Sequence, residues 1–324
     1  MSVKFSFHAE KEVRTFPKRP SAVLKGDRVA VFSPSSPADG ARTEKGIAEL
    51  QRLRFSVDPL RDFPPEGYFA ASEETRRREF RELLQRKDIA CLVALRGGYG
   101  SNYLVDALSG DQLDSPKCIV GFSDLTTLQI YLWQKYGWVT VYGPMVAAGL
   151  DGGEGAANGY DRDSLLNALT RTDSGWEIIL GGEMLQKGAC EGRVLGGAMT
   201  LVEATLGTPW ELNTDDSILL LEDRGMKPYQ VDRALMHLKH AGKFKNLRGI
   251  VLGEFPECEP PVPGSPSVRD VCERILVPLG VPIVFGAAFG HTPRPMVTVP
   301  LGVRARLHAD GEGALEILEP AVTA

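Results

Sequence analysis

The sequence is poor in the features that mark secreted, membrane-spanning and nucleic-acid-binding proteins. Its five cysteines are odd in number and never spaced as C-x-x-C, which argues against a disulfide framework or a zinc cluster. No stretch approaches the roughly 20 consecutive apolar residues that span a bilayer. Charges interrupt the first 20 residues, where a signal peptide would need an apolar core. We therefore expect a cytoplasmic protein with buried free thiols and no metal.

The chain also lacks an excess of charge of either sign. The formal net charge is −5, and acids and bases alternate along the sequence. Neither nucleic acid nor an anionic membrane is therefore the expected partner. What is present is a globular composition, with 43% apolar and 24% charged residues over 324 positions. That length allows one large domain or two.

Apolar runs alternate with helical patterns through the first half of the chain. Uniformly apolar strands between helices predict a parallel sheet covered on both faces, Rossmann-like or flavodoxin-like. Ser72 and the acids after it open one of these helices, and Gly137 ends another. The expected strands are 28–32, 89–95, 117–122 and 138–144, and the expected helices are 42–53, 72–88, 101–108 and 124–136.

The second half differs in its glycine content and its β-rich end. Loose glycine-rich stretches fall between residues 151 and 192 and predict a crossing between domains. After them come apolar strands, one long helix over 228–242, and a β-rich tail over 304–318. We therefore predict an N-terminal α/β domain over 1–160, a linker over 161–190, and a smaller, β-rich α/β domain over 191–324.

Three polar side chains directly follow or end apolar strands, where ligands gather at an open parallel sheet. They are Ser123 after "CIVGF", Glu222 after "SILLL" and His291 after "VPIVFGAAFG". A serine hydroxyl needs a base within hydrogen-bond reach, and that base needs an acceptor that fixes its tautomer. Serine, acid and histidine in this chain order match hydrolases with a strand–turn–helix nucleophile. The set predicts a catalytic triad.

Each of these residues also has an ordinary interpretation. Ser123 could cap the following helix, which is common for serine at a helix start. Glu222 could pair with Arg224 at the surface, and His291 could be a loop histidine without a partner. "GFSDL" has only the leading glycine of G-x-S-x-G. For each residue taken alone, the ordinary interpretation is favoured over a catalytic one. Three residues suited to a triad at three strand ends together favour catalysis.

The stretch "LRGGYGS" (95–101), with its glycine turn from Arg96 to Ser101, raises the question of a cofactor. It fits neither G-x-G-x-x-G nor the P-loop pattern, so no nucleotide cofactor is expected. Its glycines could instead bring a backbone N–H close to a reacting carbonyl. The N–H of Asp124, at the helix start after Ser123, is a second candidate donor for an oxyanion hole.

At this point the sequence resembles the LD-carboxypeptidases, a family of serine peptidases that includes murein tetrapeptide carboxypeptidase and the microcin C immunity protein. The resemblance covers nearly the whole chain, from residue 26 to residue 307. It is carried by ordered motifs: "GDRVAVFSPSSP", "LRGGYGS", "GFSDLTTL", "YGPM", "GGAMTLVEATLGTPW", "LLLEDRGMKPYQVDRALMHLKHAGKF", "GIVLGEF" and "FGHTPRPMVTVPLGVRARL".

The resemblance implies a triad of Ser123, Glu222 and His291 and an oxyanion hole at Gly98 and Asp124. It also implies a site in the cleft between two domains, no metal or other cofactor, and a homodimer. The implied reaction releases a C-terminal D-amino acid from an L-centre, as in peptidoglycan recycling. Because an exopeptidase must bind a free carboxylate, Arg96 and Arg224 are candidate ligands for it.

The chain departs from the family at four positions: Tyr142 where His is frequent, Ala198 where Asn is frequent, Met226 near a common acid and Tyr103 near a common Arg. None of these positions belongs to the triad, so the departures bear on substrate contacts. Two other functions stay open: an amide hydrolase acting on a peptidyl-nucleotide, as in the immunity branch, and a peptide-binding protein without catalysis.

Overall fold

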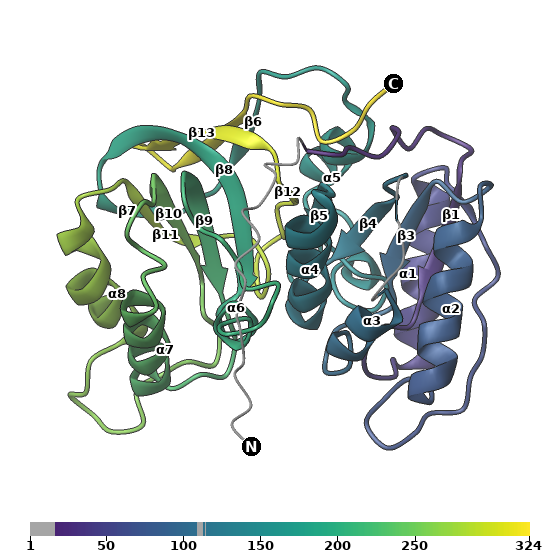
Figure 1. Cartoon of the computed structure of the whole chain (residues 1–324), viewed down its shortest axis with the longest axis horizontal. Helices are drawn as coiled ribbons and strands as arrows, with labels where there is room; N and C mark the ends of the chain where they lie inside the picture. The colour runs from purple at the N-terminus through teal and green to yellow at the C-terminus, as the bar shows by residue number, and fades with distance from the viewer. Residues whose placement is uncertain (1–16, 109–112, 114) are drawn as a thin grey trace, which may run out of the picture.

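Two β-sheets with helices packed on them make up the protein. The computed structural model describes residues 17–108, 113 and 115–324, so residues 1–16 of the predicted first domain lie outside the described part. Figure 1 shows the two sheets side by side, with the helices α4 and α6 between them. The architecture is α/β, with one sheet built mainly of parallel strands and a second, mixed sheet.

The first sheet has the strand order expected of a flavodoxin-like fold, with one added edge strand. The strands β2, β1, β3, β4 and β5 are parallel neighbours in that order, and β12 joins β5 in antiparallel orientation. In this topology ligands bind beyond the carboxyl ends of the strands. The bounds are β1 (Arg28–Phe32), β2 (Ser56–Val57), β3 (Cys91–Ala94), β4 (Cys118–Gly121), β5 (Thr140–Tyr142) and β12 (Val299–Leu301).

The second sheet has eight strands in the order β6-β14-β13-β8-β9-β10-β11-β7. Its central strands β8 to β11 are parallel, whereas β6, β14, β13 and β7 are antiparallel to their neighbours. The bounds are β6 (Trp176–Ile179), β7 (Glu183–Gln186), β8 (Gly188–Ala198), β9 (Ser217–Glu222), β10 (Gly249–Gly253), β11 (Ile283–Ala287), β13 (Arg304–Ala309) and β14 (Ala314–Ile317).

Helices form at the five places where the sequence predicts them (α1, α2, α3, α4 and α7), whereas α5, α6 and α8 were not predicted; several helix ends follow local chemistry. Ser72 caps one helix by accepting a hydrogen bond from Thr75 N, and Gly137 ends another with φ 69°. The α-helices are α1 (Gly40–Arg52), α2 (Glu73–Gln85), α3 (Asn102–Ala107), α4 (Thr126–Tyr136), α5 (Arg162–Thr170), α6 (Met199–Ala204), α7 (Pro228–His240) and α8 (Val268–Leu276). Short 3-10 turns are η1 (Ser123–Leu125), η2 (Leu150–Gly152) and η3 (Val277–Leu279).

The central strands are buried from end to end, which explains their uniformly apolar sequences. All residues of β3, β4 and β9 are buried, including the terminal Glu222 of β9. Helices cover these strands, and α7 and α8 lie together on the outer side of the second sheet (Figure 1). Parallel strands enclosed in this way read as continuous hydrophobic runs.

The segment predicted as a linker, 161–190, contains regular structure. It holds α5 and the strands β6 and β7, which occupy the two opposite edges of the second sheet. In β6 buried and exposed residues alternate, and no residue of β7 is fully buried, which suits strands at the edges of a sheet.

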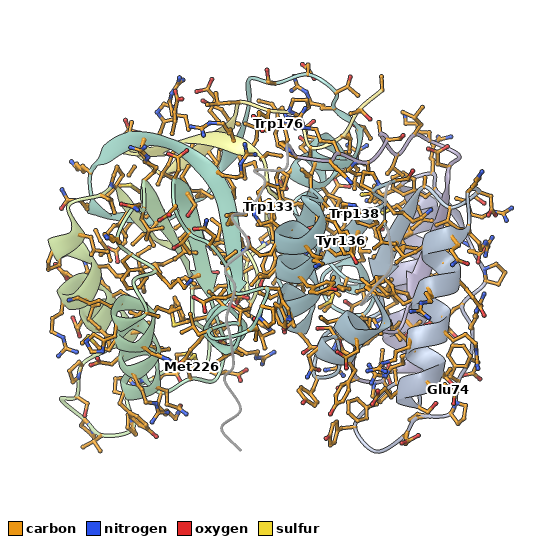
Figure 2. The ribbon with its side chains drawn as sticks, viewed as in Figure 1. Glu74, Trp133, Tyr136, Trp138, Trp176 and Met226 are labelled. Carbon is orange, nitrogen blue, oxygen red and sulfur yellow. The ribbon has the colours of Figure 1, made fainter. Side chains whose placement is uncertain are left out.

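The two sheets are joined through α4. Its Thr126 Oγ1 accepts a hydrogen bond of 3.0 Å from Ala198 N at the end of β8. Trp133, on the same helix, lies between the two sheets (Figure 2), with the Arg193 guanidinium 5.4 Å from its ring centroid. A side chain at Gly302 would strike that indole, at 2.7 Å from Cε3. Trp133 therefore packs against residues of both sheets, Arg193 of β8 and Gly302 after β12, and holds the two sheets together at this point.

Candidate active site

Ser123 lies at the turn between β4 and α4 in a backbone conformation that serine rarely adopts. Its φ is +61°, in the left-handed region. The serine side chain caps neither η1 nor α4. The interpretation of Ser123 as a helix cap is therefore wrong: it is the first residue of a short 3-10 turn, it is partly exposed, and its backbone is strained.

Glycine at position 97 is needed to make room for this hydroxyl. A Cβ on Gly97 would lie 3.1 Å from Ser123 Oγ and 3.5 Å from Asp124 N. The glycine turn after β3 therefore lies directly against the serine. Within the described chain, the backbone N–H groups of Gly98 and Asp124 donate to no protein acceptor. The two donors that the sequence suggests for an oxyanion are thus available at this turn.

Glu222 and His291 come together at the ends of β9 and the loop after β11. The imidazole Nδ1 lies 2.7 Å from Glu222 Oε2, and the backbone N–H of His291 donates to the same oxygen at 3.0 Å. An ionised carboxylate only accepts hydrogen bonds, so Nδ1 carries the proton and Nε2 is left as the free base. The surface pair of Glu222 with Arg224 and the partnerless loop histidine are both wrong.

The two groups shift each other's proton affinity. Glu222 is completely buried, and burial raises its pKa, yet the charge of His291 and three hydrogen bonds outweigh burial and leave that pKa lowered. Burial likewise lowers the pKa of His291, but the charge and hydrogen bond of Glu222 outweigh it, so the imidazole pKa is raised above 6.5.

The imidazole lies beside the residue that precedes Ser123. The rings of Phe122 and His291 are 5.1 Å apart, edge to face at 71°. Among the described residues no hydrogen bond joins Ser123 Oγ to the imidazole. Such bonds often form only when substrate is bound. The structure therefore brings the serine turn, the imidazole and the carboxylate to one place without closing the last hydrogen bond.

The Asp124 carboxylate ties three loops of the first sheet together. Its Oδ2 accepts from Ser35 Oγ at 2.5 Å and from Ser101 N at 2.7 Å, and Ser101 Oγ donates to Asp124 O. Burial raises the pKa of this carboxyl, although these hydrogen bonds oppose the shift. Because the loops after β1 and β3 both bond to it, the side chain of Asp124 is structural and only its N–H is free.

A buried arginine, which no sequence pattern predicts, also bonds to the loops after β1 and β3. Arg76 of α2 is 1% exposed and donates to Pro34 O at 2.6 Å and to Gly100 O at 2.8 Å. Its guanidinium also lies 4.6 Å from the Phe69 ring centroid. In the sequence it is one of three consecutive arginines, and nothing in that run singles it out.

The two candidate arginines for a substrate carboxylate lie in different surroundings. Arg96 is half-buried and directly precedes Gly97, and among the described residues its side chain bonds only to Pro37 O, at 3.1 Å. Arg224 is about half exposed and pairs with Glu257 at the surface. Arg96 is therefore next to the serine turn in the chain and has guanidinium donors that no described residue accepts.

No group of three or more potential metal ligands occurs in the part of the chain that the structure describes. In the same residues, no helix combines the length and apolar character that crossing a bilayer requires.

Gly290 packs directly against the Glu222 side chain, so we expect a side chain at this position to be destabilising. Its φ is +68°, and an added Cβ would lie 2.5 Å from Glu222 Cγ and 2.8 Å from Oε1. Gly290→Ala should lower the free energy of unfolding by about 1–2 kcal/mol for the backbone and by about 1–3 kcal/mol more for crowding. Urea unfolding measures this loss.

Gly280→Ala is the matched control for Gly290→Ala. Gly280 has nearly the same φ, +70°, but nothing lies within 4 Å of an added Cβ. Only the backbone cost should therefore appear in this variant. Equal losses of stability in the two variants would show that Gly290 does not crowd Glu222.

Family models match both halves of the chain. Residues 29–143 match the LD-carboxypeptidase N-terminal domain, and residues 191–307 match the LD-carboxypeptidase C-terminal domain. The first range runs from within β1 to the end of β5 and includes the serine turn, and the second begins within β8 and includes β9 to β11 with Glu222 and His291.

Curated relatives align over most of their own length. A probable murein peptide carboxypeptidase of Bacillus subtilis (strain 168) is 30% identical over 294 residues, covering 90% of this chain and 91% of that protein. The microcin C7 self-immunity protein MccF of Escherichia coli is 29% identical over 337 residues, covering 93% of this chain and 96% of that protein.

Solved structures agree with these matches. MccF in complex with glutamyl sulfamoyl guanosine has a TM-score of 0.82 at 25% identity and covers 95% of this chain and 100% of its own. Muramoyltetrapeptide carboxypeptidase from Oxalobacter formigenes has a TM-score of 0.77 at 25% identity, covering 92% and 100%. Since sequence and structure agree over both sheets, the chain belongs to the LD-carboxypeptidase family and is a peptidase.

Proposed function

We propose that this peptidase is a serine carboxypeptidase that hydrolyses the amide between an L-centre and a C-terminal D-amino acid. The observation that carries the proposal is the buried Glu222–His291 pair, 2.7 Å apart, beside the strained turn of Ser123. The relatives named as murein peptide carboxypeptidases support a cell-wall peptide as substrate. We include in the proposal release of D-alanine from a murein tetrapeptide, for peptidoglycan recycling.

In this mechanism Ser123 Oγ attacks the scissile carbonyl while His291 Nε2 takes its proton. Glu222 keeps Nδ1 protonated and stabilises the imidazolium that forms. The N–H groups of Gly98 and Asp124 donate to the oxyanion, at the start of η1 where the helix dipole favours negative charge. The imidazolium then protonates the leaving amine, and water releases the acyl group from Ser123 by the same steps in reverse.

The free carboxylate of the substrate needs a cation close to the serine. Arg96 suits this role better than Arg224, because it adjoins Gly97 and has unused donors, whereas Arg224 is paired with Glu257. We also propose that the enzyme works in the cytoplasm as a homodimer. Its five cysteines are all free thiols, which suits a reducing compartment.

A second candidate substrate is a peptidyl-nucleotide. MccF has been solved with glutamyl sulfamoyl guanosine and with aspartyl sulfamoyl adenosine, and its fold matches this chain with a TM-score of 0.82. The same Ser123, Glu222 and His291 set would cleave the amide of such a compound. The leaving group separates the two substrates: it is a D-amino acid for the cell-wall peptide and a sulfamoyl nucleoside for compounds such as glutamyl sulfamoyl guanosine.

A substrate panel tests the proposal directly. Purified protein is incubated with matched peptides ending in an L,D or an L,L pair, including a murein tetrapeptide, and with an aminoacyl sulfamoyl nucleotide. Mass spectrometry identifies the products. We expect the peptides with a terminal L,D pair to give the highest kcat/KM of the panel, with release of the terminal D-amino acid. Preference for the nucleotide would favour the immunity-type function, and no turnover of any compound would favour a binding protein.

The pH dependence follows from the raised pKa of His291. The base must be neutral to accept the serine proton, so activity is lost as the imidazole becomes protonated. Because its pKa is raised above 6.5, kcat/KM should reach half its maximum on the acid side above pH 6.5. Initial rates between pH 5 and 9 measure this limb. A midpoint below pH 6.5 would contradict the role of Glu222 as the charge beside His291.

A further inference from the structure

The phenol of Tyr142 connects the serine turn to the buried carboxylate. Tyr142 ends β5 and lies opposite Gly121 of the neighbouring strand β4. It is completely buried. Its hydroxyl donates to Glu222 Oε1 at 2.6 Å and accepts the backbone N–H of Ser123 at 3.3 Å. One side chain therefore bonds to two of the three residues of the proposed triad.

The hydrogen bonds of Glu222 show what this phenol contributes. Oε2 receives two donors, both from His291. In the part of the chain that the structure describes, Oε1 receives a hydrogen bond from Tyr142 alone, and Glu222 is 0% exposed, so solvent does not replace the phenol. A buried carboxylate oxygen without a donor is costly. Tyr142 thus completes the hydrogen bonding of Glu222 and holds the plane of its carboxylate toward His291.

The walls around Glu222 leave the carboxylate little other freedom. A Cβ at Gly253 would lie 2.6 Å from Glu222 Cβ, and Gly290 packs against the carboxylate itself. The Tyr142 ring is held in turn by Phe122 and Phe289, at 6.2 Å and 6.1 Å between centroids. The phenol is therefore a fixed donor on a rigid strand.

We propose that Tyr142 is a positioning residue that aligns Glu222 for His291 and couples this alignment to the backbone of the Ser123 turn. The inference rests on the proposed function, because it assigns Tyr142 to the same reaction. Tyr142 touches neither the substrate nor the reacting atoms in this role. It acts through the orientation and charge of Glu222 and through the N–H of Ser123.

The expected effect on protonation has a definite sign. A hydrogen bond from the phenol stabilises the Glu222–His291 pair most when the pair carries a net negative charge, with the imidazole neutral. Removing the phenol therefore makes the pair bind its proton more tightly. The other charged groups that act on His291 are Asp223, which favours the imidazolium, and Arg224, which opposes it. Neither is bonded to Tyr142.

Tyr142→Phe removes only the hydroxyl and tests the proposal. We expect kcat on the substrate of the native enzyme to fall about ten- to hundredfold, the worth of a hydrogen bond to a charged group. KM should change little, and the acid limb of the pH profile should move to higher pH. A purely structural role would lower the amount of folded enzyme without moving the limb.

Tyr160→Phe is the matched control, because it deletes the same kind of bond elsewhere. Tyr160 is also completely buried, and its hydroxyl donates to Glu49 Oε1 at 2.6 Å. This variant should keep the kcat and the acid limb of the native enzyme. Equal kinetic behaviour of the two variants would overturn the proposal.

A measurement without substrate separates this inference from the proposed function. In ¹⁵N-histidine-labelled Ser123→Ala protein, the imidazole of His291 is titrated by NMR and assigned with His291→Gln. Adding Tyr142→Phe should raise its apparent pKa, and adding Tyr160→Phe should not. An unchanged titration would overturn the role of Tyr142 even if the enzyme is a serine carboxypeptidase, and a shift would support it even if the substrate differs.

A second variant keeps the test valid if Tyr142→Phe does not fold. Incorporation of 3-fluorotyrosine at position 142 preserves the shape of the ring but makes the phenol a stronger donor. The same titration of His291 should then move to lower pH, opposite to the change expected for phenylalanine. No movement with fluorotyrosine would overturn the proposal.

Discussion

Ser123→Ala is expected to reduce release of the terminal D-amino acid about a millionfold, to the level that binding and the oxyanion donors alone provide. The hydroxyl oxygen forms the acyl-enzyme, and the neighbouring Asp124 carboxylate does not replace it, because that carboxylate is buried and bonded to Ser35 and Ser101. Because alanine removes a single oxygen, the fold should be unchanged. D-alanine release from a murein tetrapeptide is measured by chromatography. In a second assay, a serine-directed probe should label the native enzyme and not Ser123→Ala.

Ser265→Ala provides the control for loss of a serine hydroxyl. Ser265 lies in the loop before α8, and this variant should retain full turnover. Near-native release of D-alanine by folded Ser123→Ala would end the serine mechanism, whatever the substrate.

Glu222→Gln is expected to lower kcat about ten-thousandfold, as for a triad whose acid is made neutral. The amide nitrogen can face His291 Nδ1 only as a donor, which forces the imidazole into the wrong tautomer or away from the serine. If the amide oxygen faces His291 instead, the nitrogen meets the Tyr142 hydroxyl, which must then give up its role as donor. Both arrangements also remove the charge that stabilises the imidazolium.

Steady-state kinetics on the same peptide measures this loss, with thermal unfolding as a check on folding. Glu257→Gln is the control, because Glu257 is an exposed acid paired with Arg224 and should leave kcat within about twofold. Turnover by Glu222→Gln within tenfold of the native enzyme would contradict the assignment of Glu222 as the acid of the triad.

Much of the fold was predictable because its signals are local. Apolar runs predict the strands β1, β3, β4 and β5 of the first sheet, and Ser72 and Gly137 mark helix ends that the structure confirms. The edge strands β2, β6, β7 and β12 were not predicted. Each has only two to four residues, so pairing with a partner strand rather than local composition decides its structure.

The candidate site was predictable to the extent that it follows strand ends. Ser123, Glu222 and His291 were found in this way, and the same argument applied to β5 would have pointed to Tyr142. Arg76 carries no such signal, because an arginine in a basic helix is normally exposed. Its burial depends on two loop carbonyls and an aromatic ring that only the tertiary structure assembles.

The strand β12 has a consequence for synthesis of the chain. Residues 299–301 complete the sheet that carries Ser123 by pairing with β5, and the backbone of Thr323 bonds to that of Pro20 and Ala22, about 300 residues earlier in the sequence. A nascent polypeptide on the ribosome that stops short of residue 299 therefore leaves β5 as an open apolar edge. The first sheet is therefore complete only after residue 301 has been synthesised, so a fragment released before that residue lacks a finished sheet around Ser123.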